Sequence, residues 1–213
     1  LVNIGYRPIL WHLMRYYAHY RHTDFILALG YRGDLIREYF LNYKECMTND
    51  FTISDGGRRI ELHGSDTADW RITFVDTGLH SNIGQRLLRV KKHLDGEEAF
   101  LANYSDGLSD LPLDELIAEF KRRRVVAAFS SVLSGHSFHA VEADLDGMVT
   151  ALQPMKGDSF MINGGYFALR HDIFDYIEQG EELVEQPFHR LIERQSLYAY
   201  RYRGFCNIGA IGT

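Results

Sequence analysis

Apolar residues along this chain follow two patterns that alternate with each other. Spacings of three and four residues, typical of one face of a helix, occur within residues 9–17, 35–40, 87–94 and 113–120, and in shorter stretches around 173 and 191. Short apolar runs typical of strands occur at 25–29, 72–75, 99–104, 125–132, 167–169 and 197–202. Strands that alternate with helices predict an α/β fold, with a mostly parallel sheet and helices on both of its faces.

One segment departs from this alternation. Asp146 and Gly147 form a turn signal between two stretches in which polar and apolar residues alternate, so we expect a small antiparallel insertion there. No internal repeat and no linker rich in proline, glycine or serine divides the sequence. We therefore expect a single domain over residues 1–213.

The composition narrows the classes of function. With 213 residues, of which 46% are hydrophobic, the chain can bury one sizeable core. Its net charge of -6 provides no overall positive field, so we expect neither nucleic acid nor a membrane among its partners, while a homo-oligomer stays open. No apolar run approaches the roughly 18 residues of a membrane-spanning helix.

The two cysteines and the first residues bear on location. Cys46 and Cys206 lie far apart and offer neither a disulfide framework nor a zinc-ligand spacing, which favours a reducing, cytoplasmic compartment. The start of the chain lacks the basic and apolar regions of a secretory signal. Because the sequence starts with Leu1 rather than methionine, we expect that it begins inside a longer protein.

The expected fold indicates where a ligand would bind. In open α/β sheets, ligands lie at the carboxyl ends of the strands, here the turns after Leu29, Val75 and Tyr104. Asp106 follows the third strand, and Mg²⁺ accepts one or two carboxylates together with phosphate oxygens. An aspartate before a glycine also commonly caps a turn, so the position alone leaves a metal ligand and a turn cap as alternatives.

Two further segments carry candidate chemistry. Residues 76–86 lead from a strand end through a glycine-containing turn into a helix, where backbone amides and Arg86 could hold an anion. The alternative is a solvated loop with an exposed arginine. Asn163, Gly164 and Gly165 allow a ligand to approach the backbone closely, or form a plain turn.

Other nucleotide-binding and catalytic motifs are missing from this sequence. There is no GxGxxG motif after a strand and no Walker lysine, so dinucleotide and P-loop binding are unsupported. The ten histidines show no ligand-like grouping, and no cysteine or serine is paired with a histidine in a recognisable pattern.

Several segments, taken in chain order, resemble the glucose-1-phosphate cytidylyltransferases, a branch of the sugar-phosphate nucleotidyltransferases. The similar segments are VNIGYRPILWHLM (2–14), FILALGYRG (25–33), FVDTG (74–78), GQR (84–86), AFL and YSDG (99–107), and KGD and MINGG (156–165). The similarity runs nearly from end to end. An ordered set of matches is more specific than any one of the motifs.

This resemblance implies a Rossmann-like nucleotidyltransferase fold. It also implies a reaction in which a sugar 1-phosphate attacks a nucleoside triphosphate and releases pyrophosphate, with Mg²⁺ as cofactor. The branch that the chain resembles indicates glucose 1-phosphate and CTP as the substrates. By the same resemblance, the nucleotide would be contacted by Ser81, Arg86 and Ser105, Mg²⁺ by Asp106, and the sugar phosphate by Asn163 and Gly164. Arg86 and Asp106 would be the catalytic residues.

The chain departs from the family pattern in three places. The family's glycine-rich GGxGTR loop, its first strand and its KPKP lysine would precede Val2. Where the family often has Glu-Lys-Pro, this chain has Leu152 and Gln153 before the proline, and Lys156 is the candidate replacement for the phosphate-binding lysine. The family's late aspartate, a second metal ligand, has no counterpart near Ala210.

These departures leave two hypotheses. The chain is an active nucleotidyltransferase whose ends lie outside this sequence, or it is a related binding or regulatory module without catalysis. A glycosyltransferase is a more distant alternative, because Asp106-Gly107-Leu108 is not the Asp-x-Asp motif of those enzymes. By itself, the 213-residue chain is expected to catalyse poorly, since three charged or positioning elements are missing from it.

Overall fold

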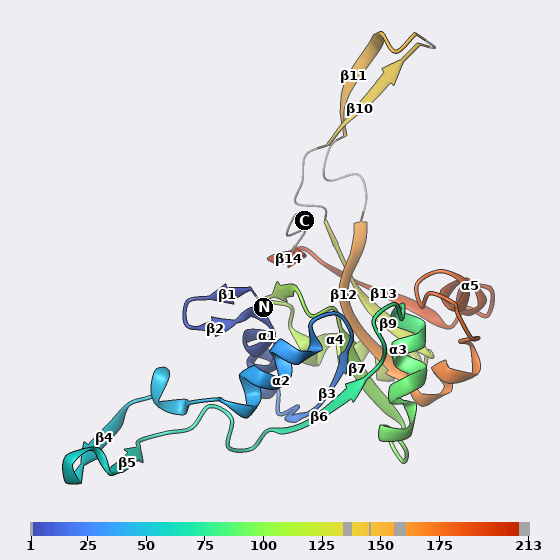
Figure 1. The fold of residues 1–213 in the computed structure, drawn as a ribbon. Coiled ribbons are helices and arrows are strands. Elements are labelled where there is room, and N and C mark those ends of the chain that lie inside the picture. The colour runs from blue at the N-terminus through green and yellow to red at the C-terminus, as the bar shows by residue number, and fades with distance from the viewer. Residues whose placement is uncertain (1, 134–137, 145, 156–160, 209–213) are drawn as a thin grey trace.

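The computed structural model describes residues 2–133, 138–144, 146–155 and 161–208. Figure 1 shows a body of strands and helices from which two hairpin arms extend in different directions. No helix in these described ranges is long and apolar enough to cross a membrane.

The largest sheet has four strands in the order β13-β9-β12-β7. These strands are β13 (Leu197–Tyr202), β9 (Ala127–Leu133), β12 (Met161–Arg170) and β7 (Ala99–Asn103). β13 runs parallel to β9, whereas β12 runs antiparallel to both of its neighbours.

A separate parallel pair joins β3 (Asp24–Leu29) to β6 (Arg71–Asp76), in a register that places Leu29 opposite Asp76. The sequence pattern suggested that residues 25–29 form a fully buried strand, but only Leu29 in β3 is buried and Ala28 is exposed. The reason lies in the pairing, because β6 is the single hydrogen-bonded neighbour of β3 in the described part of the chain.

The prediction of a mostly parallel sheet is not confirmed by these pairings. Two strand pairs within the described ranges are parallel, but β12 makes antiparallel ladders on both of its edges. The physical reason is that β12 returns after the inserted hairpin arm, without the crossover helix that a parallel connection requires. The α/β character of the fold is confirmed.

The remaining described strands form short antiparallel pairs. They are β1 (Asn3–Ile4) with β2 (Arg7–Pro8), β4 (Phe51–Ser54) with β5 (Arg59–Leu62), β10 (Phe138–Ala143) with β11 (Val149–Met155), and β8 (Gly107–Ser109) with β14 (Cys206–Ile208). The β10–β11 arm confirms the predicted antiparallel insertion, and its turn uses Gly147 at φ 82°. The β4–β5 arm was not predicted.

Five α-helices are described, and they follow the predicted apolar patterns. They are α1 (Ile9–His19), α2 (Gly33–Leu41), α3 (Ile83–Val90), α4 (Leu113–Arg123) and α5 (Gln186–Glu193). Short 3₁₀ turns complete the path at η1 (Glu45–Met47), η2 (Asp55–Gly57), η3 (Lys91–His93) and η5 (His171–Asp175). Helix α3 begins at a capping box. The Asn82 side chain accepts a hydrogen bond from the Gln85 backbone amide, and the Gln85 side chain accepts one from the Asn82 backbone amide.

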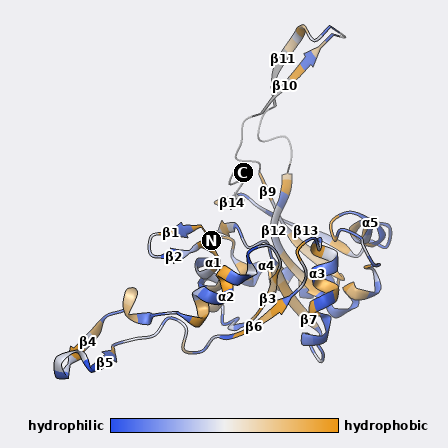
Figure 2. Ribbon diagram, in the orientation of Figure 1, coloured by the Kyte–Doolittle hydropathy of each residue, from blue (hydrophilic) through white to orange (hydrophobic). Residues whose placement is uncertain are grey.

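The core lies on both faces of the four-stranded sheet. Along β12, Phe167 and Leu169 belong to a cluster that α3 and α5 cover, whereas Tyr166 and Ala168 belong to a cluster that α1 and α4 cover. This alternation follows from the two-residue period of a strand. Hydrophobic residues accordingly gather on the strands of the body (Figure 2), and the prediction of helices on both faces is confirmed.

Candidate functional site

The Arg86 side chain lies where the parallel strands β3 and β6 end. Its Nη1 donates a hydrogen bond to Thr77 Oγ1 at 2.6 Å. A Cβ atom on Gly30 would lie 2.4 Å from Arg86 Nη2, so the guanidinium packs directly against the backbone at this strand end. No carboxylate in the described ranges forms an ion pair with Arg86. The half-buried arginine is therefore a cation without a neutralising partner in those ranges.

The turn that leads into α3 is tightly folded. Buried Thr77 bonds the Leu29 carbonyl through both its amide and its hydroxyl, each at 2.8 Å, which fixes the turn to the end of β3. The Ser81 hydroxyl donates to the Thr77 carbonyl oxygen, and Gly78 adopts φ 86° between them. Ser81 therefore closes this turn, and its oxygen keeps a lone pair with which it can accept a further hydrogen bond.

A second group of predicted residues gathers where β7 ends. Asn163 Nδ2 donates to Tyr104 Oη at 3.2 Å, and Asn163 Oδ1 accepts from the Gly165 amide at 2.9 Å. The register of β12 against β9 shifts between Asn163 and Phe167, so Gly164 and Gly165 form a bulge. Bulges are frequent beside active sites, where they redirect the chain.

Both glycines of this bulge are required by close contacts. A Cβ atom on Gly165, which has φ 78°, would lie 2.7 Å from the ring of Tyr104. A Cβ atom on Gly164 would lie 2.4 Å from Ser130 Oγ. The structure thus brings Asn163 and Gly164 beside the segment that leads to Asp106.

Ser105 and Asp106 form the turn after Tyr104, and both are exposed. Burial raises the pKa of the Tyr104 phenol, the nearby charges of Glu182 and Asp106 raise it further, and the hydrogen bond from Asn163 lowers it. Tyr104 therefore remains a neutral hydroxyl group near neutral pH. The carboxylates of Asp106 and Glu182 both lie near enough to act on it.

Glu182 lies at the start of α3 and was not predicted from the sequence. Its Oε2 accepts a hydrogen bond from the Ile83 amide at the start of α3 at 3.2 Å, and its Oε1 accepts from its neighbour Leu183 at 3.0 Å. A carboxylate at a helix N-terminus is electrostatically favourable. In sequence, Glu181 and Glu182 look like a solvated charged loop, so no local signal could have identified this role.

The residues present fit a divalent cation that is also held by a substrate. The described residues contain no group of three or more histidine, cysteine, aspartate or glutamate side chains that could hold a metal unaided. Asp106 offers an exposed carboxylate at a strand end. Mg²⁺ is commonly bound by one or two carboxylates with phosphate oxygens completing its shell, so this single donor suffices with a phosphorylated ligand.

Lys156 lies outside the described residues, so its predicted contact with a sugar phosphate stays a prediction. The positions of Ser81, Arg86, Ser105, Asp106, Asn163 and Gly164 are described, and these residues fall into two groups, one at the turn before α3 and one beside the end of β7.

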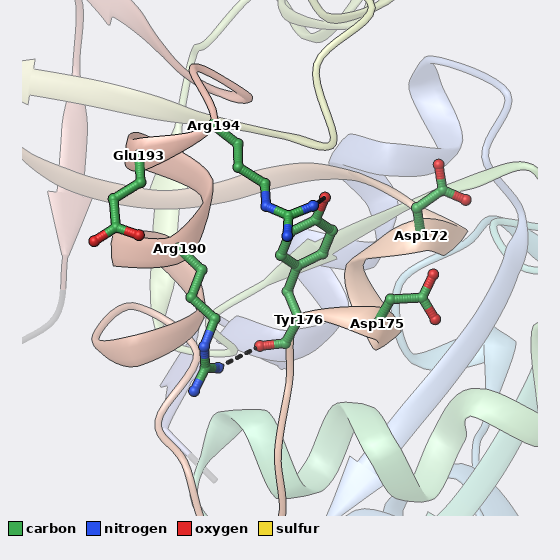
Figure 3. Close-up of a pocket in the computed structure, with 6 residues that line it drawn as sticks. All are labelled: Asp172, Asp175, Tyr176, Arg190, Glu193 and Arg194. Carbon is green, nitrogen blue, oxygen red and sulfur yellow. Dashed lines mark hydrogen bonds between the residues drawn. The ribbon is translucent and has the colours of Figure 1, made fainter.

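A polar cavity of about 360 Å³ lies elsewhere, on η5 and α5 (Figure 3). Its arginines are already engaged, since Arg190 donates to the Tyr176 carbonyl at 2.7 Å and to Glu181 at 2.6 Å, and Arg194 stacks over the Tyr176 ring. None of the predicted site residues lines it. The strand ends, where the half-buried Arg86 and the glycine bulge lie, are therefore the candidate ligand site.

Comparison with known proteins found no matching family model. The chain is 36% identical over 206 residues to the glucose-1-phosphate cytidylyltransferase of Salmonella typhi, which covers 96% of this chain and 80% of that protein. It is 34% identical over 207 residues to the probable glucose-1-phosphate cytidylyltransferase of Bacillus subtilis, with the same coverage.

Among solved structures, HddC from Yersinia pseudotuberculosis superposes with a TM-score of 0.62 at 15% identity, covering 96% of this chain and 81% of that one. A UDP-glucose pyrophosphorylase complexed with UDP-glucose gives a TM-score of 0.64 at 12% identity, covering 96% and 82%. At such low identities these similarities show a shared fold.

Proposed function

Because the chain belongs to the glucose-1-phosphate cytidylyltransferase family, we propose that it transfers the cytidylyl group of CTP to glucose 1-phosphate. In this reaction a phosphate oxygen of the sugar phosphate attacks the α-phosphorus of the nucleotide. The bond from that phosphorus to the bridging oxygen breaks, and pyrophosphate leaves. The products are a nucleotide sugar and pyrophosphate.

The chemistry makes clear what the protein must supply. Two polyanions have to be held in line with each other, so catalysis rests on positioning and on neutralising charge, with no covalent intermediate required. A half-buried cation that forms no ion pair within the described residues is suited to this task. Arg86 is such a cation, and its position at the ends of β3 and β6 is the observation that carries the proposal.

In the proposed arrangement, Arg86 binds phosphate oxygens of CTP through the donors that Thr77 does not use. The tight turn closed by Ser81 presents its backbone to the nucleotide, and Ser105 contacts it from the turn after β7. Arginine suits this role because its planar group binds phosphate with two parallel hydrogen bonds.

The sugar phosphate would lie against the β12 bulge. Asn163 is oriented by its two hydrogen bonds to Tyr104 and Gly165, and Gly164 lets the ligand approach the backbone. Lys156 would supply a positive charge to the sugar phosphate. Asp106 would hold Mg²⁺, which when bound neutralises charge on the phosphate oxygens.

The test is a pyrophosphate-release assay with Mg²⁺, glucose 1-phosphate and each nucleoside triphosphate in turn. Both the 213-residue chain and the product of its complete reading frame should be assayed. The proposal is supported if either protein releases pyrophosphate only when CTP and glucose 1-phosphate are both present. Binding of CTP without any pyrophosphate release in both forms would instead support the non-catalytic module.

A further inference from the structure

The first turn of α3 is held from outside the helix by the loop of residues 180–182. The side-chain amide of Asn82 donates a hydrogen bond to the Gly180 carbonyl oxygen at 2.9 Å. The backbone amide of Ile83 donates to the Glu182 carboxylate at 3.2 Å. Backbone amides at a helix start have no acceptor within the helix, so this carboxylate satisfies one of them. The start of α3 therefore depends on a loop that lies far away in the sequence.

The loop and the helix start are also in direct contact. Gly84 is buried, and a Cβ atom there would collide with the Glu181 carbonyl oxygen. Leu183, at the end of the loop, is completely buried and belongs to the same core cluster as Leu87 of α3. Packing at this density transmits small displacements from one element to the other. A shift of the loop would accordingly shift the first turn of α3.

Asn82 connects this loop to Arg86 by a single backbone hydrogen bond. Its carbonyl oxygen accepts from the Arg86 amide at 3.0 Å, while its side chain caps the helix and bonds Gly180. Arg86 then directs its guanidinium to Thr77 at the ends of β3 and β6. The residue that the loop holds is thus the residue from which Arg86 extends one turn later.

The loop itself is anchored by Arg190 of α5. The Nη1 and Nη2 atoms of Arg190 donate to the two carboxylate oxygens of Glu181, at 2.6 Å and 2.5 Å. Arg190 also donates to the Tyr176 carbonyl oxygen at 2.7 Å, as Figure 3 shows. Two parallel hydrogen bonds between planar groups fix their relative orientation as well as their distance.

The Glu181–Arg190 pair is suited to holding geometry more than to adding stability. The Glu181 side chain is 15% exposed and that of Arg190 is 34% exposed, and ion pairs at the surface contribute little to stability through their charge. Hydrogen bonds from Arg190 and from the Glu178 amide hold the pKa of the Glu181 carboxyl below its usual value, so the pair is charged at neutral pH. Its orientation is therefore maintained under ordinary conditions.

We propose that Arg190 and Glu181 are positioning residues for nucleotide binding, because their ion pair holds loop 180–182 against the start of α3 and thereby fixes Arg86. This inference rests on the proposed function, in which Arg86 binds phosphate oxygens of CTP. Both residues act through the helix. A planar guanidinium that must meet two phosphate oxygens tolerates little displacement, so a loose helix start weakens binding even when Arg86 is intact.

The first test uses the protein without ligand. Glu181→Gln keeps the size of the side chain and removes its charge, so amide hydrogens at the start of α3 should exchange about three- to tenfold faster than in the wild type. Arg190→Gln should have the same effect, whereas exchange in α4 should not change. Glu178→Gln is the control, because this side chain is 77% exposed and lies 3.6 Å from Arg190. Hydrogen exchange followed by mass spectrometry measures these rates.

The second test asks whether the effect on CTP passes through Arg86. Calorimetric titration with Mg²⁺ and CTP should show that Glu181→Gln and Arg190→Gln each weaken binding by about three- to tenfold. Arg194→Gln, on a neighbouring arginine that stacks over Tyr176, should bind like the wild type. In an Arg86→Ala background, Glu181→Gln should weaken binding no further, because interacting residues are not additive. Unchanged melting temperatures would show that the variants are folded.

The two tests separate this inference from the proposed function. A wild-type chain that binds no CTP would contradict the proposed function, and the exchange rates of the ligand-free protein would still decide whether the pair fixes α3. Unchanged exchange at α3 in both Glu181→Gln and Arg190→Gln would overturn the positioning role even if the wild type binds CTP. An effect of Glu181→Gln on CTP affinity that persists undiminished without Arg86 would overturn it as well.

Discussion

The Tyr104 hydroxyl accepts a hydrogen bond from Asn163 Nδ2 at 3.2 Å, so the end of β7 and the bulge of β12 are fixed to each other. The same tyrosine ring lies where a Cβ atom on Gly165 would come, at 2.7 Å. The Tyr104 side chain therefore orients Asn163 and also leaves no room for a side chain at Gly165. The bulge and the Asp106 turn behave as one unit in this geometry.

Gly165→Ala should therefore destabilise the fold by about 2–4 kcal/mol, since it combines a left-handed backbone with a clash against Tyr104. Gly180→Ala is the matched control. Gly180 also has a positive φ, of 93°, but a Cβ atom added there would meet no atom within 4 Å. Urea denaturation measures both. A Gly165→Ala variant no less stable than Gly180→Ala would show that the Tyr104 contact imposes no constraint.

Arg86→Ala should weaken CTP binding by about ten- to a hundredfold, the cost of one charge-assisted phosphate contact. Calorimetric titration with Mg²⁺ and CTP measures this affinity. Lys92→Ala removes the same charge from the exposed turn after α3 and should bind CTP like the wild type. If Arg86→Ala keeps wild-type affinity, Arg86 has only the structural role of bonding Thr77.

Asp106→Asn should abolish the dependence of CTP binding on Mg²⁺ while leaving the melting temperature unchanged. The side chain keeps its size and loses its charge, so the loss is electrostatic, and its exposed position makes a change in folding small. Asp95→Asn, another exposed aspartate, serves as the control. If Mg²⁺ changes the CTP affinity of Asp106→Asn as much as it changes that of the wild type, Asp106 does not bind the metal.

Glu45 lies at the base of the β4–β5 arm, and it should make the stability of the folded protein depend on pH. Burial alone would raise the pKa of Glu45, but hydrogen bonds from Thr67, Ser65 and two backbone amides outweigh it and hold the pKa below its usual value. A lowered pKa in the folded state contributes stability that is present above the unfolded pKa of about 4.3 and is lost as the pH falls through the folded value.

The matching variant is Glu45→Gln, which keeps the shape and removes the charge. It should cost about 1 kcal/mol at pH 7, allowing for screening of this partly exposed group, and the difference from wild type should shrink below about pH 4. Urea denaturation between pH 3 and pH 7 measures it. Glu97→Gln, at an exposed loop position, should show no such trend, and a difference for Glu45→Gln that stays constant with pH would contradict the assignment.

The elements were largely predictable because they depend on local sequence. Helices α1, α3 and α4 follow apolar residues at helical spacing, and the Asp146-Gly147 turn places the β10–β11 arm. The β4–β5 arm carries an equally local signal, with alternating residues on either side of Asp55-Gly56-Gly57, although the arm was not predicted.

The strand pairing was less predictable because it joins residues far apart in the chain. Nothing in residues 161–170 indicates that β12 runs antiparallel to both β7 and β9, and the half-exposed state of β3 depends on which strands pair with it. Burial of a strand is a property of its neighbours as well as of its own composition.

The candidate site divides in the same way. The sequence by itself determined which residue types stand at the strand ends, namely Asp106 after β7 and the turn before Arg86, and its ordered motifs indicated the family. Only the tertiary structure decided that Arg86 lies against Gly30, that Asn163 bonds Tyr104, and that Glu182 bonds the Ile83 amide at the start of α3. Local composition selects helices and strands through backbone and packing preferences, whereas contacts between side chains 50 to 100 residues apart exist only once the sheet has formed.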